Sequence, residues 1–298
     1  MTDHTTHSDN VRWPLPRKIL CAVDLSDFAA PILAHAVALA RDYRAEVAAV
    51  HVFATWAPPP GIELSPGWTM HVPDMREEIT KGLRTLVEPF VLGGRPVPLH
   101  TTEGDAAREI VRYADDWGAD LVVIGTHGRS GFDRFALGSV AEKVLRKASC
   151  PVLTLPPGAA RSVVDVAYRH MLCPTDFSEC SADALDFAVT LAVRADADVT
   201  ALHVIEAPDG EQEPHGETER DALRDFTTAH TVTGCRISEL VVRGRPHREI
   251  LRVATERQAD LVVMGVRGRG PVDLTLFGST TNQVVRRAAC PVMTVRGR

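Results

Sequence analysis

The sequence predicts two tandem α/β domains, each a Rossmann-like parallel sheet covered by helices. Shifting the chain by 140 residues brings Gly104–Leu155 onto Gly244–Val295, with the same Arg-Glu-Ile, Ala-Asp-Leu-Val-Val and Cys-Pro-Val strings in both segments. Each half alternates short β-branched runs with alanine-rich stretches, which predicts a parallel sheet wound with right-handed crossovers. The length of 298 residues allows two domains that each bury a core.

Each half is expected to contain five strands separated by helices. The strands are short apolar runs without clean alternation, which is typical of strands covered on both faces. Clear helical patterns span Pro31–Tyr43 and Ala182–Ala195, and Ser26 and Ser178 are placed to cap them. The expected strands are Lys18–Val23, Glu46–Phe53, Val97–Thr102, Leu121–Gly125 and Val152–Leu155, then Met171–Thr175, Asp198–Ile205, Arg236–Arg243, Leu261–Gly265 and Val292–Val295.

The first half is longer than the second because of one insertion. The N-terminal parts of the two halves align at an offset of 152, and the extra residues fall mainly in Ala54–Pro73, which is rich in Pro and Gly. This composition predicts a loop after the second strand. We expect a flexible tail over 1–15, domains over 16–158 and 166–298, and a linker over Pro156–Val166.

Composition and charge exclude several classes of protein. A net charge of −6 disfavours a protein that coats nucleic acid or an anionic membrane. No apolar run approaches the roughly 20 residues of a membrane span, and the polar N-terminus lacks a signal pattern, so a cytoplasmic protein is expected. The six cysteines include no Cys-x-x-Cys pair, and they are expected to be small buried residues without disulfides.

A glycine string follows the fourth strand in both halves with identical spacing. Gly125-Thr-His-Gly128 precedes Gly138-Ser139 by nine residues, and Gly265-Val-Arg-Gly268 precedes Gly278-Ser279 by nine. Such glycines let the backbone approach an anion, and the helix that follows offers its unpaired N–H groups and positive dipole end. Two matched copies favour a duplicated phosphate-holding loop over simple turn residues.

The first strand of each half ends in an aspartate, Asp24 or Asp176. In an open parallel sheet these carboxylates meet the glycine loops where the winding direction reverses. An anion there suits base or ribose donors better than phosphate, although both residues could simply cap helices. His127 is either a phosphate or ribose contact or a solvated loop residue, and its counterpart is Arg267, which disfavours a shared catalytic histidine.

Other polar residues near these loops leave alternatives open. Arg129 and Arg269 match across the repeat and could brace phosphates or stand exposed, while His51 and His203 are expected to be structural. The sequence has no Gly-Lys-Ser/Thr phosphate loop, no Gly-x-Gly-x-x-Gly after the first strand, no Gly-x-Ser-x-Gly elbow and no His-Glu-x-x-His pair. We therefore expect no catalytic residue and no metal ligand, and sites that hold a ligand.

Taken together, the glycine strings, the strand-end aspartates and the closing Cys-Pro-Val strands resemble the ATP-binding branch of the universal stress protein family. The resemblance runs from about Lys18 to Val295 and implies a five-stranded parallel sheet of order 3-2-1-4-5 in each half. It also implies ATP as the ligand, with Mg²⁺ left open. In the first domain the implied ATP-binding residues are Ala22, Val23, Asp24, Val52, Gly125, His127, Gly128, Gly138, Ser139 and Val140. In the second they are Pro174, Thr175, Asp176, Val204, Gly265, Arg267, Gly268, Gly278, Ser279 and Thr280.

Two departures from the family pattern predict unequal affinities. Ala22-Val23 replaces the frequent Pro-Thr pair, and Arg267 with Gly270-Pro271 alters the second loop. The expected function is a nucleotide-dependent regulator of a stress response, not a fast enzyme. Two alternatives remain: a slow ATPase in which Asp24 or His127 assists water, and an interaction scaffold with incidental nucleotide. The resemblance further implies pairing through the last strands, either in a homodimer or between the two halves of one chain.

Overall fold

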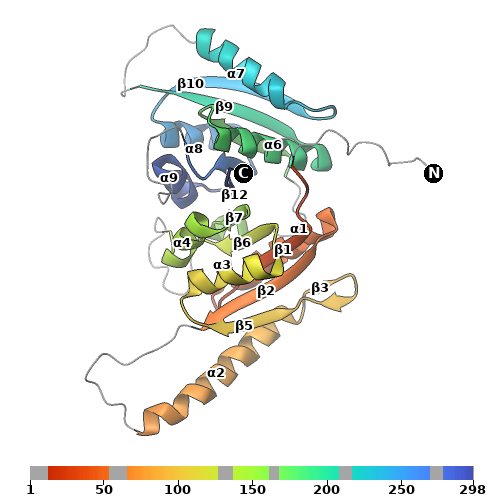
Figure 1. Ribbon diagram of the computed structural model, residues 1–298, viewed down its shortest axis with the longest axis vertical. Coiled ribbons are helices and arrows are strands. Elements are labelled where there is room, and N and C mark those ends of the chain that lie inside the picture. The colour runs from red at the N-terminus through yellow and green to blue at the C-terminus, as the bar shows by residue number, and fades with distance from the viewer. Residues whose placement is uncertain are drawn as a thin grey trace, which may run out of the picture. The chain divides into compact units, whose positions relative to one another are not determined.

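The computed structural model describes residues 13–53, 66–126, 137–160, 168–207, 217–268 and 278–297 (Figure 1). The chain divides into two compact units. The first unit holds Pro16–Ser149, and the second holds Cys150–Ala159 together with the described residues before Pro16 and those from 168 onward. Each unit carries one glycine string, so each is described by itself.

The first unit is built on a parallel sheet of order β5-β2-β1-β6. Its elements are β1 (Lys18–Ala22), α1 (Ala29–Tyr43), β2 (Glu46–Phe53), α2 (Pro66–Val87), β3 (Val91–Leu92), β4 (Arg95–Pro96), β5 (Leu99–Glu103), α3 (Ala106–Trp117), β6 (Leu121–Gly125) and α4 (Ser139–Lys147). Strands β3 and β4 form a separate hairpin that the sequence reasoning did not predict. Gly93 and Gly94 at its turn have φ of 57° and 79°, as a two-residue hairpin turn of this hand requires.

The second unit contains the order 3-2-1-4-5 in full, as β10-β9-β8-β11-β12. Its elements are β7 (Val152–Leu155), α5 (Pro157–Ala160), β8 (His170–Thr175), α6 (Glu179–Ala195), β9 (Asp198–Glu206), α7 (Glu217–His230), β10 (Arg236–Gly244), α8 (Pro246–Glu256), β11 (Leu261–Gly265), α9 (Ser279–Arg287) and β12 (Val292–Val295). These five strands are mutually parallel. The predicted α/β class with a mostly parallel sheet is therefore confirmed.

Strand β7, the last strand of the first repeat, pairs antiparallel with β12, the last strand of the second. Two buried hydroxyls reinforce the pair, because Thr154 Oγ1 donates to Val292 O at 3.0 Å and Thr294 Oγ1 donates to Val152 O at 3.2 Å. The last strands of the two repeats thus meet each other within the chain.

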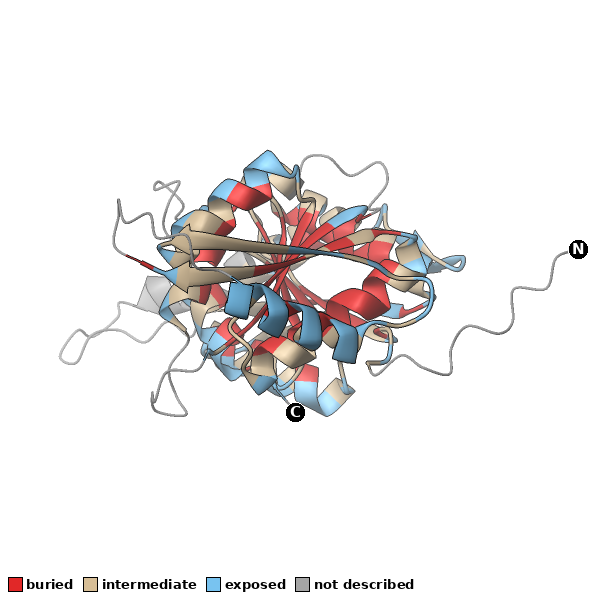
Figure 2. Ribbon diagram, turned by 90° about the horizontal axis from the view of Figure 1, so that it is seen from above, coloured by how far each residue is buried: buried red, intermediate tan, exposed pale blue. Residues whose placement is uncertain are grey.

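The central strands are apolar because helices cover them on both faces. Leu121–Ile124 of β6 and Leu261–Met264 of β11 are buried, and Figure 2 shows buried residues along the strands. Phe187 on α6 is among the largest fully buried side chains, and Trp13 packs edge-on against it with ring centroids 5.6 Å apart. Trp13 lies inside the segment that the sequence predicted as a tail.

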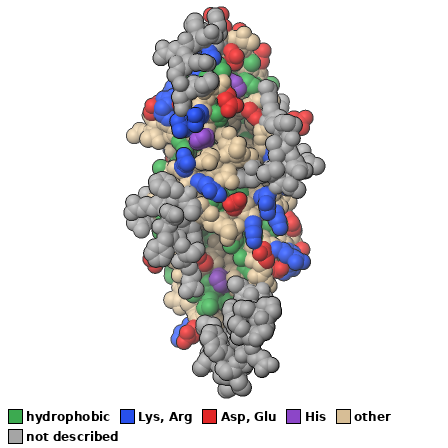
Figure 3. Space-filling view, turned by 90° about the vertical axis from the view of Figure 1, so that its left-hand side faces the viewer, with side chains coloured by type: hydrophobic (Ala, Val, Ile, Leu, Met, Phe, Trp, Pro, Cys, Tyr) green, Lys and Arg blue, Asp and Glu red, His purple; other side chains and the backbone are tan. Residues whose placement is uncertain are grey.

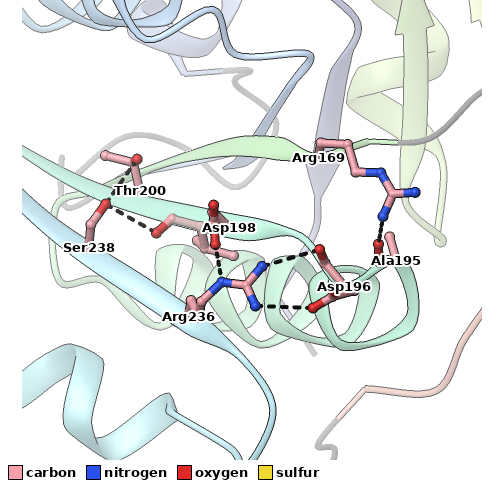
Figure 4. A network of polar contacts seen from close by, with 8 residues as sticks. Arg169, Ala195, Asp196, Asp198, Thr200, Arg236 and Ser238 are labelled. Atoms are coloured by element: carbon pink, nitrogen blue, oxygen red, sulfur yellow. Dashed lines mark hydrogen bonds and ion pairs between the residues drawn. The ribbon is translucent and has the colours of Figure 1, made fainter.

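Polar contacts hold the beginnings of β9 and β10 in register. Arg236 lies opposite Asp198, and its guanidinium contacts the Asp198 carboxylate at 2.5 Å and that of Asp196 at 3.1 Å (Figure 4). The hydroxyls of Thr200 and Ser238 meet at 3.1 Å two pairs further along. The two carboxylates, Asp198 first, raise the pKa of Arg236. This register carries through to the other end of both strands, where Glu206 lies opposite Gly244.

Two local predictions were wrong. Ser26 does not cap α1, because the helix begins three residues later, at Ala29, and its N-cap Phe28 makes no side-chain cap hydrogen bond. Ser178 does cap α6, accepting from the N–H of Ser181 at 3.3 Å. The predicted loop Ala54–Pro73 is helical from Pro66 on, since Pro66 stands at the first helical position, where no backbone N–H is needed. Residues 54–65 of that loop lie outside the described residues.

Candidate functional site

A pocket of about 600 Å³ opens at the carboxyl-terminal edge of the second unit's sheet. It lies where β8 and β11 end side by side, which is the switch point of this topology. All ten residues that the resemblance implied for the second domain line it, and the structure thus brings them together. The lining residues are Pro174, Thr175, Asp176, Ser181, Leu202, Val204, Glu206, Pro246, Ile250, Met264, Gly265, Arg267, Gly268, Gly278, Ser279, Thr280 and Thr281.

The turn after β8 fixes the carboxylate of Asp176. Its Oδ1 accepts from the backbone N–H of Ser178 at 3.1 Å and from the Ser178 hydroxyl at 2.6 Å. Phe177 between them adopts a left-handed φ of 61°, and its N–H donates to Thr175 Oγ1 at 3.0 Å. With Oδ1 engaged by its own turn, Oδ2 points toward the glycine loop, where a Cβ on Gly268 would lie 2.5 Å from it.

The other two glycines of the loop also sit where a side chain would collide. A Cβ on Gly265 would lie 2.9 Å from Cys180 Sγ and 3.0 Å from Cys180 O. A Cβ on Gly278 would lie 3.2 Å from Val266 O, to which the Gly278 N–H donates at 3.0 Å. Glycine is therefore favoured here by close packing against Cys180 at the start of α6 and against the backbone after β11.

Helix α9 directs its N-terminus at this loop. Gly278 is its N-cap and has no side chain with which to cap the first-turn N–H groups. Ser279 is exposed beside them, and Thr281 Oγ1 donates to Gly265 O at 2.9 Å, which ties the helix to the strand end. A helix start with uncapped N–H groups is a favourable place for an anion.

Charges of opposite sign separate along the sheet edge. Asp176 follows β8 and Glu206 ends β9, whereas Arg267 follows β11 on the other side of β8. Burial and then the nearby Arg267 lower the pKa of Arg296, which indicates a second guanidinium close to that end. The pocket thus offers acceptors at one end and cationic or N–H donors at the other.

Basic side chains also gather around the starts and ends of α8 and α9. Burial, followed by the charges of Arg287, Arg248 and Arg245, lowers the pKa of His247. Figure 3 faces the side on which α8 and α9 lie in Figure 1 and shows groups of Lys and Arg side chains there. This surface therefore raises the positive potential near the α8 N-terminus.

A family model described as the universal stress protein family matches residues 16–156 and again residues 167–296. The chain belongs to the universal stress protein family. Universal stress protein MJ0531 of Methanocaldococcus jannaschii is 35% identical over 141 residues, 47% of this chain and 82% of that protein. Universal stress protein Rv2005c of Mycobacterium tuberculosis is 30% identical over 191 residues, 60% of this chain and 62% of that protein.

A solved universal stress protein from Archaeoglobus fulgidus is similar in fold over nearly the whole chain. It matches with a TM-score of 0.69 at 22% identity and covers 94% of this chain and 96% of its own. The repeat recognised in the sequence is thus two universal stress protein domains.

The first domain of this universal stress protein repeats the turn geometry in its described part. Asp24 Oδ1 accepts from the N–H and hydroxyl of Ser26 at 3.0 and 2.5 Å, as Asp176 does from Ser178. Gly138 donates to Thr126 O at 2.8 Å and begins α4 as an N-cap without a side-chain bond. The other implied residues that the structure describes lie on or directly after β1, β2, β6 and α4 of the first domain: Ala22, Val23, Val52, Gly125, Ser139 and Val140. His127 and Gly128 lie outside the described residues.

Two histidines that the sequence predicted to be structural support the strand ends beneath the sites. His203 Nδ1 lies 2.9 Å from Thr175 O, and His51 Nδ1 lies 2.8 Å from Val23 O. A carbonyl oxygen only accepts, so each Nδ1 carries the proton and donates. His203 also packs on Phe177, with ring centroids 4.4 Å apart. Each histidine therefore holds the residue that precedes its aspartate.

Sequence reasoning missed the side of the pocket formed by β9 and α8. Leu202, Val204 and Glu206 alternate along β9 onto one face, and Pro246 and Ile250 of α8 oppose them. A period of two along the strand could have added Leu202 and Glu206 to Val204. Of the described residues that line the pocket, none is a lysine or a histidine.

Within the described ranges, no helix is long and apolar enough to cross a membrane. Nor do the described residues bring three or more His, Cys, Asp or Glu side chains together in a way that could hold a metal ion.

Proposed function

We propose that the pocket of the second domain binds an adenine nucleotide, with ATP as the ligand, and that the protein acts as a nucleotide-dependent regulator of a stress response in the cytoplasm. The observation that carries the proposal is the contact of the Asp176 carboxylate with Gly268 beside the uncapped start of α9. One crevice thereby combines an acceptor for sugar hydroxyls with donors for phosphates. Its volume of about 600 Å³ suits a ligand of nucleotide size.

The division of charge assigns the parts of the nucleotide. Phosphates would lie on the Gly265–Gly268 loop, Arg267, Ser279 and the α9 N-terminus, and the sugar would face Asp176. The base would lie on the apolar side chains of Leu202 and Val204. The first domain would bind in the same way with a different affinity, because Ala22-Val23 stands where the second domain has Pro174-Thr175.

The experiment is to denature the purified full chain and identify any released nucleotide, then to follow thermal unfolding with added ATP. A ligand at a hundred times its Kd stabilises the folded state by about 2.7 kcal/mol, which is readily measured. Absence of released nucleotide together with an unchanged unfolding temperature at millimolar ATP would contradict the proposal.

An interaction scaffold remains the second candidate, because β7 and β12, the last strands of the two repeats, pair with each other. Replacing both Gly138 and Gly278 with valine separates the two candidates. A scaffold would keep its cellular phenotype in this double variant, whereas a nucleotide-dependent regulator would lose it.

A further inference from the structure

The end of β9 places a carboxylate at the base side of the second pocket. Glu206 is the last residue of β9, lines the pocket and is exposed at its rim. Leu202 and Val204 precede it on the same face of the strand, so an apolar floor leads up to this single acidic side chain.

The backbone around Glu206 is held on both sides. Glu206 pairs in register with Gly244 on β10, and the next N–H, from Ala207, reaches Gly244 O at 3.4 Å. Gly244 has a φ of +145° and leads directly to Arg245, the N-cap of α8, and to Pro246 at its first turn. Pro246 forms the opposing wall and has no N–H with which to compete for the carboxylate.

The order of the strands determines which part of a nucleotide Glu206 would meet. In the proposed binding mode the phosphates lie over β11 and α9, and the sugar lies beside Asp176, which follows β8. The next strand outward is β9, so the base reaches Leu202, Val204 and finally Glu206. An ionised carboxylate only accepts hydrogen bonds, and it therefore selects a base edge that presents an amino group over one that presents a carbonyl oxygen.

We propose that Glu206 is a specificity-determining residue of the second site, which accepts a hydrogen bond from the exocyclic amino group of the base and rejects the 6-carbonyl analogue. This inference rests on the proposed nucleotide binding and adds the base selectivity to it. Its counterpart at the repeat offset is Ala54, so the selectivity belongs to the second domain.

The test compares ATP with ITP, in which a carbonyl replaces the 6-amino group and N1 carries a proton. Titration calorimetry is run on the full chain carrying Gly138→Val, which is expected to weaken binding at the first site because a Cβ there meets Thr126 O at 3.3 Å, with and without Glu206→Gln. Glutamine can turn its amide to donate to a carbonyl, so the variant is expected to lower the ATP-to-ITP affinity ratio about tenfold, as expected for one charged hydrogen bond at a partly exposed position. Glu217→Gln, an exposed glutamate of α7 outside the pocket lining, is the matched control and is expected to leave the ratio unchanged.

Each outcome decides one claim. If Glu206→Gln and its parent have the same ATP-to-ITP affinity ratio, and both still bind ATP, the proposed role of Glu206 is overturned. The role of Glu206 is also overturned if the parent binds ITP as tightly as ATP. If neither nucleotide binds the parent or the unmutated chain, the proposed function itself fails. Should Gly138→Val fail to fold, a two-site titration of the chain with only Glu206→Gln gives the same ratio for the second site.

Discussion

The carboxylate of Asp176 lies so close to Gly268 that a Cβ on residue 268 would come within 2.5 Å of Oδ2. These residues are 92 positions apart in the sequence and meet because β8 and β11 are neighbours in the sheet. The contact closes the crevice between the first strand of the domain and its glycine loop. The proposed nucleotide site depends on it.

Gly268→Ala is therefore expected to displace the loop or the carboxylate and to weaken ATP binding at the second site by at least about tenfold. Residue 268 is exposed, so the unfolding temperature should change little. Gly158→Ala is the control, since a Cβ there meets nothing within 4 Å. Unchanged second-site affinity in Gly268→Ala would show that the close contact has no part in binding.

Arg267 is expected to act on the phosphates. Arg267→Ala should lower the affinity for ATP about tenfold while leaving that for adenosine almost unchanged, because the guanidinium stands at the β11 side of the pocket. Competition binding with both ligands measures the two effects, and Arg220→Ala on the exposed face of α7 serves as the charge-matched control. An equal loss of affinity for ATP and for adenosine would show that Arg267 does not act on the phosphates.

Replacing His203 with asparagine should largely preserve the free energy of unfolding, whereas replacing it with leucine should lower it. The asparagine amide can donate to Thr175 O as Nδ1 does, whereas leucine leaves that buried carbonyl without this donor, which costs about 1–3 kcal/mol. Urea unfolding of His203→Leu and His203→Asn compares the two free energies. If both variants lose the same stability, the hydrogen bond contributes nothing beyond packing.

The buried His35 on α1 should make the first unit sensitive to acid. His35 is only 5% exposed, and burial lowers its pKa to about 4 from an ordinary 6.5. Below pH 6.5 the unfolded chain takes up a proton that the folded chain does not accept until about pH 4, so stability falls as the pH drops through this window. At about 1.4 kcal/mol for each pH unit between the two pKa values, the effect is about 3 kcal/mol.

His35→Leu is expected to flatten that part of the curve of unfolding free energy against pH, measured by chemical denaturation between pH 4 and 7. His170→Gln, at an exposed position, should leave the slope as it is. A slope that survives in His35→Leu would mean that other groups cause the acid sensitivity.

Repeats and buried strands were predictable because the physical signals are strong and duplicated. The run Leu261–Met264 is buried on both faces and therefore apolar throughout. The hydrogen bonds of Ser26 were not predictable, since its hydroxyl donates to Asp24 and α1 begins only at Ala29. Glu206 was missed because it has no acidic counterpart in the first repeat, where Ala54 stands at the same offset, and only the strand period of two pointed to it.

Titration calorimetry of the full chain with ATP, after removal of any copurified nucleotide, tests the central claim most directly. The account predicts saturable binding at two sites of unequal affinity, with the site that is lost on Gly268→Ala belonging to the second domain. No measurable heat and no thermal stabilisation at millimolar ATP, in a chain whose unfolding is cooperative, would contradict it.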